Sequence, residues 1–164
     1  MNPKSRLSFK DVMSLVPTGV SVLSFLESNL VFSCTISSLV SVNIQEDNPE
    51  VLFVLKKDSL FGNKIRSGLV FTINVLSSDQ SDLAKIYSTS RDPDIASEAN
   101  WHVDKRFAVI RGCRSVINCQ LSKVYDSHSA DIFIGSVLSY SGDAEKSALL
   151  YDARSYGIFE SFNQ

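Results

Sequence analysis

Residues 35–43, with the sequence Thr-Ile-Ser-Ser-Leu-Val-Ser-Val-Asn, carry the residue types most suited to chemistry in this chain. Hydroxyl side chains, from Thr35, Ser37, Ser38 and Ser41, alternate there with large aliphatic ones. Such hydroxyls either bond the neighbouring backbone as local turns or line an apolar cleft and hold a polar ligand. The segment by itself leaves both interpretations open.

A second candidate lies just after the apolar run at 51–55, which predicts a strand buried on both faces. Lys57 and Ser59 follow it, and residues 59–67, closed by Gly68, predict a short helix. A cation, a hydroxyl and free backbone N–H groups at such a corner suit a phosphate. A helix cap beside a solvated lysine has the same spacing, so this pattern too has two interpretations.

Length and composition limit the classes of protein to consider. The chain has 164 residues, 44% hydrophobic and 21% charged, which is typical of a globular protein, and we expect a single domain over residues 1–164. The net charge of −2 provides no basic footprint for nucleic acid or for an anionic membrane. We therefore expect neither nucleic acid nor membrane as a partner.

Cysteine and histidine usage argues against structural metals and disulfides. Cys34, Cys113 and Cys119 are odd in number and form no Cys-x-x-Cys pair, so we expect reduced, buried thiols. The two histidines, His102 and His128, are far apart in sequence and lack a neighbouring cluster of carboxylates. No metal site is predicted.

The N-terminal region imitates a secretory signal only in part. Lys4 and Arg6 precede the apolar residues 12–26, but Pro17 and Gly19 interrupt them, and no small-residue cleavage pattern follows. No run approaches the roughly eighteen apolar residues of a spanning helix. A cytoplasmic location is the expectation.

Periodicity predicts mostly strands. Ser8 and Asp11 form a capping pattern for a first helix, which Pro17 ends. Strands at 20–26 and 30–34 form a hairpin with a three-residue loop. The remaining predicted elements are a strand at 69–76, a helix at 80–87 capped by Asp79, long strands at 115–125 and 131–140, and a short strand at 148–151.

Residues 88–106, which include the single tryptophan Trp101, have no clear periodicity. A connection of this length is either a lid or binding loop or a solvated excursion, and the sequence does not decide. Strands dominate and the alternation of strand and helix typical of a doubly wound sheet is absent. The expected fold class is therefore mainly β: a closed or split antiparallel barrel with peripheral helices. Without a Gly-x-Gly-x-x-Gly motif, a nicotinamide cofactor would not be held in the Rossmann manner.

Five short motifs occur in an order that resembles the flavin reductase family of FMN-binding split barrels. They are Pro-Thr-Gly-Val at 17–20, Thr-Ile-Ser-Ser-Leu at 35–39, the apolar strand ending in Lys-Lys-Asp-Ser at 56–59, Asn-Val-Leu at 74–76 and Ile-Phe-Ile-Gly-Ser-Val at 132–137. The resemblance covers nearly the whole chain. It implies an antiparallel split β-barrel of the FMN-binding type and a bound or exchangeable flavin.

The resemblance also implies a set of cofactor-binding residues. The ring and ribityl chain would meet the first segment, the phosphate the lysine–serine corner, and a second ring contact the later strand end; the residues are Thr35, Ser37, Ser38, Val42, Lys57, Ser59, Asn74, Val75, Leu76 and Gln80. The implied reaction is hydride transfer from nicotinamide C4 to flavin N5. Because the cofactors supply that chemistry and the protein stacks the two rings, no catalytic acid or base is expected.

The chain departs from the family pattern on the nicotinamide side. Ala130 occupies the position of the usual histidine five residues before the glycine of the late strand, and His128 lies two residues earlier. Arg154, in Tyr-Asp-Ala-Arg-Ser-Tyr-Gly at 151–157, is displaced from the usual arginine sites. His128 and Arg154 are thus only weak candidates for contact with the nicotinamide.

Two functions remain open at this stage. The first is a homodimeric NADH- or NADPH-dependent reductase that delivers reduced FMN, or FAD, to a separate oxygenase. The second is a flavin-binding protein without efficient reductase activity that serves as a carrier, sensor or assembly subunit. The intact flavin motifs favour the first, whereas Ala130 and the displaced Arg154 favour the second.

Overall fold

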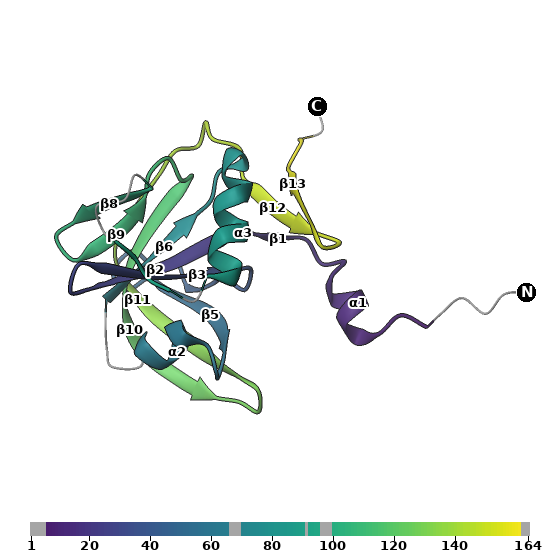
Figure 1. Cartoon of the computed structure of the whole chain (residues 1–164), viewed down its shortest axis with the longest axis horizontal. Helices are drawn as coiled ribbons and strands as arrows, with labels where there is room; N and C mark the ends of the chain where they lie inside the picture. Colours follow the sequence, from purple (N-terminus) through teal and green to yellow (C-terminus); the bar gives the residue numbers. More distant parts are fainter. Residues whose placement is uncertain (1–5, 66–69, 91, 96–99, 162–164) are drawn as a thin grey trace, which may run out of the picture.

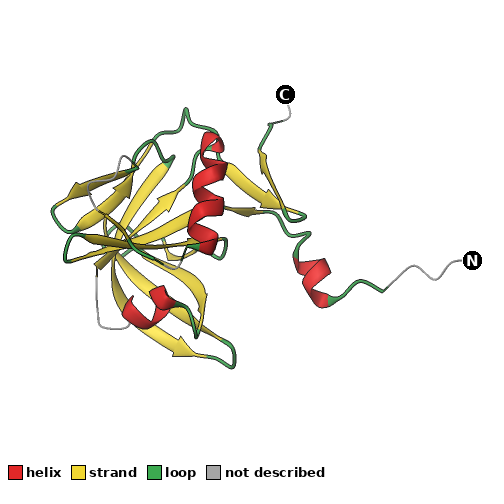
Figure 2. Cartoon of the chain, in the orientation of Figure 1, coloured by secondary structure: helices red, strands yellow, loops and turns green. Residues whose placement is uncertain are grey.

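Figure 1 and Figure 2 show a computed structural model that describes residues 6–65, 70–90, 92–95 and 100–161. Its main sheet has eight antiparallel strands in the order β4-β5-β11-β10-β6-β2-β3-β7. The mainly β, antiparallel prediction is confirmed. The strands are β2 (Ser21–Glu27), β3 (Leu30–Ile36), β4 (Val40–Asn43), β5 (Glu50–Lys56), β6 (Val70–Val75), β7 (Asp94–Ile95), β10 (Ser115–Asp126) and β11 (Ala130–Gly142).

Three helices and two smaller sheets surround this sheet in the described chain. The helices are α1 (Phe9–Met13), α2 (Leu60–Ile65) and α3 (Ser81–Thr89), the last preceded by the 3-10 turn η1 (Ser78–Gln80). One small sheet pairs β8 (Trp101–Asp104) with β9 (Phe107–Ile110), and the other joins β1 (Thr18–Gly19), β12 (Leu149–Asp152) and β13 (Ser155–Ile158). Residues 66–69, which include the predicted helix stop Gly68, lie outside the described residues.

An aromatic core fills the inside of the curved main sheet. It receives side chains from β2, β3, β5, α2, β6, β10 and β11. Phe53 stacks on Phe133 with ring centroids 5.3 Å apart, and Phe61 of α2 packs edge-on against Phe25 at 5.0 Å. Phe61 and Ile65 both point inward as predicted, so α2 closes the barrel between β3 and β5.

A second core lies on the opposite face of the same strands, under α3 and the β8–β9 hairpin. Because neighbouring residues of a strand point to opposite faces, Val22 belongs to this core and Leu23 to the first. Trp101 is 1% exposed and donates from Nε1 to the Asp94 carboxylate at 2.7 Å. Trp101 therefore belongs to the packed interior, not to a lid or solvated loop.

Two local predictions differ from the structure. The β2–β3 connection has two residues, Ser28 and Asn29, both with positive φ (50° and 68°), which is the type I′ geometry that matches strand twist. The predicted three-residue loop was wrong because Glu27 still pairs with Leu30. In β5, residues alternate between buried and half-buried, so its second face is not fully covered: the second core contains no residue of β5.

An arm formed by residues 6–19 and 149–161 projects from the barrel body (Figure 1). Its helix α1 has the predicted capping box between Ser8 and Asp11. The β1–β12 pairing joins the two chain ends, with Thr18 opposite Tyr151. No residue of α1 is buried, so the apolar face that predicted this helix is exposed to solvent.

Gly135 of β11 gives a test of core packing. A Cβ at this position would lie 2.7 Å from Phe71 Cζ and 3.2 Å from Cys119 Cβ. We expect Gly135→Ala to lower the free energy of unfolding by about 1–3 kcal/mol, because overpacking forces the Phe71 ring out of place. The control is Gly157→Ala, whose added Cβ meets nothing within 4 Å. Equal urea unfolding curves for the two variants would contradict the packing described above.

Candidate functional site

A cleft lies along the free edge of β3. Residues 32–36 pair with β2 on one side, while on the other side β7 covers only Leu30 and Val31 in the part of the chain that the structure describes. A cleft of about 790 Å³ runs along this edge. Its lining comes from three segments: residues 32–35 of β3, residues 56 and 58–61 at the β5–α2 corner, and residues 87–90 and 92 at the end of α3.

The cleft has an aromatic base. Phe32 stacks on Phe25 with a centroid distance of 5.0 Å and an interplanar angle of 10°, and Phe61 of α2 lies edge-on to the same Phe25 ring. Phe32 and Phe61 both line the cleft. Both rings are buried in the first core, at 8% and 3% exposure, and Lys64 Nζ lies over the Phe32 ring at 4.3 Å from its centroid. They form a preformed apolar base of the cleft and do not present an open ring face.

Two of the predicted flavin-binding residues, Thr35 and Ser59, meet in this cleft from opposite sides. Thr35 Oγ1 donates to the Ala84 carbonyl at 2.8 Å and so ties β3 to α3. Ser59 Oγ accepts from the Gly62 N–H at 3.1 Å, which leaves its O–H available to donate to a ligand. The structure thus brings together the serine-rich segment and the lysine–serine corner.

Other cleft residues were missed in the sequence. Tyr87, Ser88, Thr89 and Ser90 line the cleft at the end of α3, where the sequence changes from helical periodicity to an unpatterned region. A run of three hydroxyl residues after a helix was the available signal. It indicated a loop as readily as a site, because such residues commonly bond the last helical turn, as Ser88 Oγ does with the Lys85 carbonyl at 2.7 Å.

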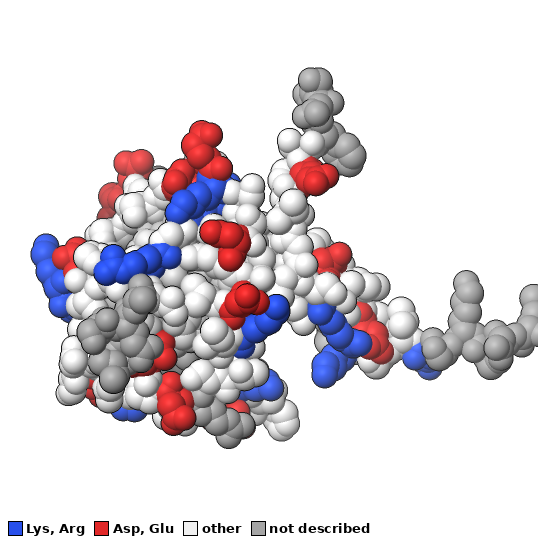
Figure 3. Space-filling view, turned by 45° about the horizontal axis from the view of Figure 1, so that its top comes forward, with Lys and Arg blue, Asp and Glu red and all other residues white. Residues whose placement is uncertain are grey.

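Charge in the cleft is mixed. Lys56 is the only cation among the described residues that line it, and Asp58 and Asp92 are acidic. On the molecular face in Figure 3, basic and acidic side chains are interspersed and form no large patch of one sign. An anionic ligand would therefore depend on local contacts more than on a long-range field.

Cys34 also lines the cleft, with its thiol held neutral. Burial raises the pKa of Cys34 to about 12. Cys119, in the first core, has its pKa raised to about 12 for the same reason. All three cysteines are free, as expected, although Cys34 and Cys113 are only partly buried. A neutral thiol at Cys34 is a poor nucleophile, which agrees with a site that binds and orients its ligands.

Three predicted residues near Thr35 lie outside the cleft lining. Ser38 Oγ donates to the Val54 carbonyl at 3.2 Å and accepts from the Val54 N–H at 2.9 Å. The Ser38 hydroxyl thus takes the place of a backbone partner for Val54 of β5. Ser37 and Val42 are exposed and absent from the lining. Of the four hydroxyls in residues 35–43, only that of Thr35 lines the cleft.

Asn74 has a structural task within the second core. It is fully buried; its Nδ2 donates to the Val22 carbonyl at 3.1 Å and to Ser24 Oγ at 2.9 Å, and its Oδ1 accepts from the Ile110 N–H at 2.8 Å. Thr35 lies opposite Val22, which lies opposite Asn74, so Asn74 is two strands away from the cleft wall. The cleft lining does not include it.

The residues that follow Asn74 also pack inside. Leu76 is fully buried in the second core, and Val75 pairs with Ser115. Gln80 is 8% exposed, accepts from the Ser77 N–H at 3.1 Å and donates to the Arg111 carbonyl at 2.8 Å. The side chains of this segment hold the start of α3 in place, and none of them lines the cleft.

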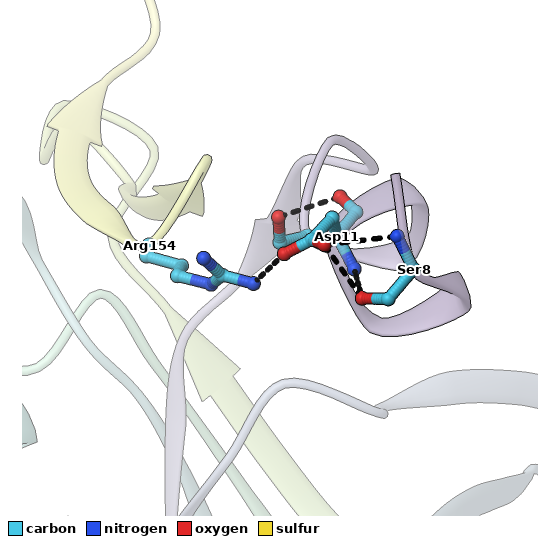
Figure 4. A network of polar contacts seen from close by, with 4 residues as sticks. Ser8, Asp11 and Arg154 are labelled. Atoms are coloured by element: carbon cyan, nitrogen blue, oxygen red, sulfur yellow. Dashed lines mark hydrogen bonds and ion pairs between the residues drawn. The ribbon is translucent and has the colours of Figure 1, made fainter. Parts of the chain in front are cut away.

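His128 and Arg154, the two nicotinamide candidates, lie apart from each other. His128 is exposed in the β10–β11 turn, whereas Arg154 belongs to the β12–β13 turn of the arm (Figure 1). Figure 4 shows Arg154 paired with Asp11, which also accepts from Ser8. The Ser8 hydrogen bonds, followed by Arg154, lower the pKa of Asp11 to about 2. Neither candidate lines the cleft.

No group of three or more His, Cys, Asp and Glu side chains suited to a metal ion occurs among the described residues. Likewise, none of the described helices has the length and apolar character needed to cross a membrane.

The role of Asn74 can be tested by truncation. We expect Asn74→Ala to lower the free energy of unfolding by about 2–4 kcal/mol, because it leaves the buried Ile110 N–H and Val22 carbonyl without partners. Asn43→Ala is the control, since its bonds to the Asn48 carbonyl and the Gln45 N–H are exposed. Urea denaturation measures both variants. A stable Asn74→Ala variant that has lost only ligand affinity would show that Asn74 contacts the ligand.

Comparison with known proteins agrees with this architecture. The model of the flavin reductase like domain matches residues 13–160. A flavin reductase of Pseudomonas putida is 31% identical over 153 residues, which cover 92% of this chain and 88% of that protein.

Two solved structures share the fold. The NADH:FAD oxidoreductase SgcE6 of Streptomyces globisporus C-1027 has a TM-score of 0.85 at 22% identity and covers 98% of this chain and 97% of its own. The styrene monooxygenase flavin reductase of Pseudomonas putida S12 has a TM-score of 0.83 at 22% identity, with coverages of 96% and 100%. The fold is thus the predicted split barrel, and the chain belongs to the flavin reductase family.

Proposed function

We propose that this single-domain protein is a flavin reductase that uses NADH or NADPH to reduce FMN, or FAD, in the cleft beside β3. One observation carries the proposal: within a member of the flavin reductase family, the edge of β3 and the β5–α2 corner enclose a cleft whose described lining includes aromatic side chains, hydroxyl groups and the cation of Lys56. The matched Pseudomonas putida protein is named a flavin reductase, and SgcE6 is named an NADH:FAD oxidoreductase.

The cleft fits what a flavin needs from a protein. Phe32 and Phe61 offer the ring an apolar base, and the edge of β3 at residues 32–36, which pairs with no strand among the described residues on that side, offers backbone groups to its heteroatoms. Ser59 and Lys56 offer a hydroxyl and a cation to the phosphate. The volume of about 790 Å³ lies within the usual range for ligand pockets.

The residues of the chain bind, orient and shield, and the cofactors supply the redox chemistry. A bound flavin offers a ring that takes up a hydride equivalent from the nicotinamide. Around it, Phe32 and Phe61 form an apolar base that excludes water, and Thr35, held by its bond to Ala84, ties β3 to α3. Such fixed positioning is the main contribution that this chemistry requires of the protein.

A separate oxygenase is the proposed recipient of the reduced flavin. The styrene monooxygenase flavin reductase, which shares the fold, is by its name the reductase of an oxygenase system. We place the protein in the cytoplasm, where the nicotinamide nucleotides are available to it.

A homodimer is the proposed assembly, and the arm supports it. Large apolar side chains on the arm are 48–79% exposed: Leu7, Phe9, Val12, Met13, Leu15, Val16, Ile158 and Phe159. A contiguous apolar surface of this kind marks an interaction site. A standard interface buries about 800 Å² per partner, and these side chains would supply much of that area. In a two-fold symmetric dimer, the arm of each copy would pack against the same surface of the other copy, so both arms would be buried.

The alternative function, flavin binding without efficient turnover, is supported by the nicotinamide side. Ala130 lacks a polar side chain, and His128 is exposed in a turn. Neither offers the nicotinamide a preformed contact in the cleft. Tight retention of flavin with negligible oxidation of NADH would favour this alternative over the reductase.

A blocking variant tests the proposed site. We expect the purified protein to oxidise NADH or NADPH when FMN or FAD is added, measured by loss of the nicotinamide absorbance. Ser88→Trp should raise the KM for flavin at least tenfold, because the indole would occupy the cleft at the end of α3. Asp82→Trp is the control, on the same helix but outside the cleft lining. Absence of oxidation with every nucleotide and flavin combination would exclude the reductase.

The arm is tested separately by measuring mass in solution. We expect the native chain to have the mass of two copies in light scattering after size exclusion. Phe9→Ser should shift it to one copy at the same concentration, because Phe9 is 79% exposed on α1. Ile86→Ser changes a side chain that is 50% exposed on α3 and should leave the mass unchanged. A native monomer would rule out this assembly.

A further inference from the structure

Lys57 and Lys56 are neighbours at the end of β5, but their surroundings differ. Lys57 Nζ lies 2.5 Å from the Asp126 carboxylate and 3.8 Å from that of Asp131. The Lys57 N–H also donates to the Ser129 carbonyl at 3.4 Å. The Lys57 side chain therefore connects the β5–α2 corner to the tip of the β10–β11 hairpin, and it does not line the cleft.

Of the two carboxylates beside Lys57, Asp131 has the greater need of a positive charge nearby. It is fully buried, at the start of β11, and pairs in register with Leu55 of β5. A buried carboxylate needs compensation by positive charge or by hydrogen bonds, because removal from water strongly disfavours its ionised form. Asp126, in contrast, has an 82% exposed side chain, and an ion pair at such a position contributes little to stability.

Withdrawal of Lys57 toward a ligand would remove a positive charge from the neighbourhood of buried Asp131. This cost opposes the role suggested by the sequence, in which Lys57 would bind the flavin phosphate. Lys56 makes no ion pair with any described residue. Its side chain is exposed and lines the cleft beside Ser59. Its ammonium group is the cation that the described part of the lining offers to an anion.

We propose that Lys57 is a positioning residue that compensates Asp131 and fixes the β5–α2 corner, so that Lys56 presents the cation to the phosphate of the ligand. The ligand role of Lys56 rests on the proposed flavin function. The pairing of Lys57 with Asp131 is independent of that function. The two parts are therefore measured separately, by ligand affinity and by thermal stability.

Thermal unfolding tests the pairing. We expect Lys57→Met to lower Tm by roughly 5–10 °C, because it removes the positive charge that lies 3.8 Å from the buried Asp131 carboxylate. Lys57→Met combined with Asp131→Asn should recover at least half of that loss, since the buried charge is gone. Lys85→Met, which breaks the exposed pair with Asp82, is the matched control and should change Tm by less than about 2 °C. A Lys57→Met change no larger than the control's would overturn the pairing.

Flavin titration tests the division of roles. FMN carries a phosphate and riboflavin does not, and fluorescence quenching gives the Kd of each. We expect Lys56→Met to weaken FMN binding about five- to tenfold and riboflavin binding less than twofold. The double variant at Lys57 and Asp131 should bind FMN within about twofold of the native chain.

Two outcomes would overturn the assignment of Lys56. One is an unchanged ratio of FMN to riboflavin affinity in Lys56→Met. The other is recovery of Tm without recovery of FMN affinity in the double variant, which would mean that Lys57 contacts the phosphate itself. If the native chain binds neither flavin, the proposed function and the ligand role of Lys56 are both wrong. The Tm values of Lys57→Met and of the double variant still test the pairing of Lys57 with Asp131.

Discussion

The unpaired edge of β3 is the constraint on which the rest of the site depends. Backbone N–H and C=O groups along a strand edge need partners, and an exposed edge invites pairing with other chains. Here α2 and the end of α3 stand at either side of residues 32–36 without pairing with them. The result is a cleft with backbone groups along one side and an aromatic base, held open by two cores on opposite faces of one sheet.

Much of the fold could be predicted from the sequence because its strands have strong patterns. The hairpin of β2 and β3, the long strands β10 and β11 and the inward residues of α2 follow from periodicity and turn residues. Trp101 could not be placed from its surroundings, since its burial depends on Asp94, β9 and α3, which pack on it from elsewhere in the chain. Likewise, no local pattern shows that the apolar face of α1 stays exposed.

The site was predicted in part, for a physical reason. Thr35 and Ser59, both predicted to bind the flavin, line the candidate cleft. Asn74 and Gln80, which were also predicted, instead form hydrogen bonds with buried backbone groups of the second core. Polar residues near a strand end serve either purpose, and the sequence does not reveal which backbone groups will lack partners. The adjacent lysines 56 and 57 show the same limit: only the burial of Asp131, seventy-odd positions away, distinguishes them.

The arm has a consequence for the order in which the molecule is built. Asp11 pairs with Arg154, 143 positions later, Ala153 donates to the Ser14 carbonyl, and Thr18 lies opposite Tyr151. During translation, the strands from β2 to β11 emerge and can collapse into a barrel while α1 still lacks these contacts. The exposed apolar helix α1 is thus anchored last, after the β12–β13 hairpin has left the ribosome and when the barrel from which α1 extends can already be complete.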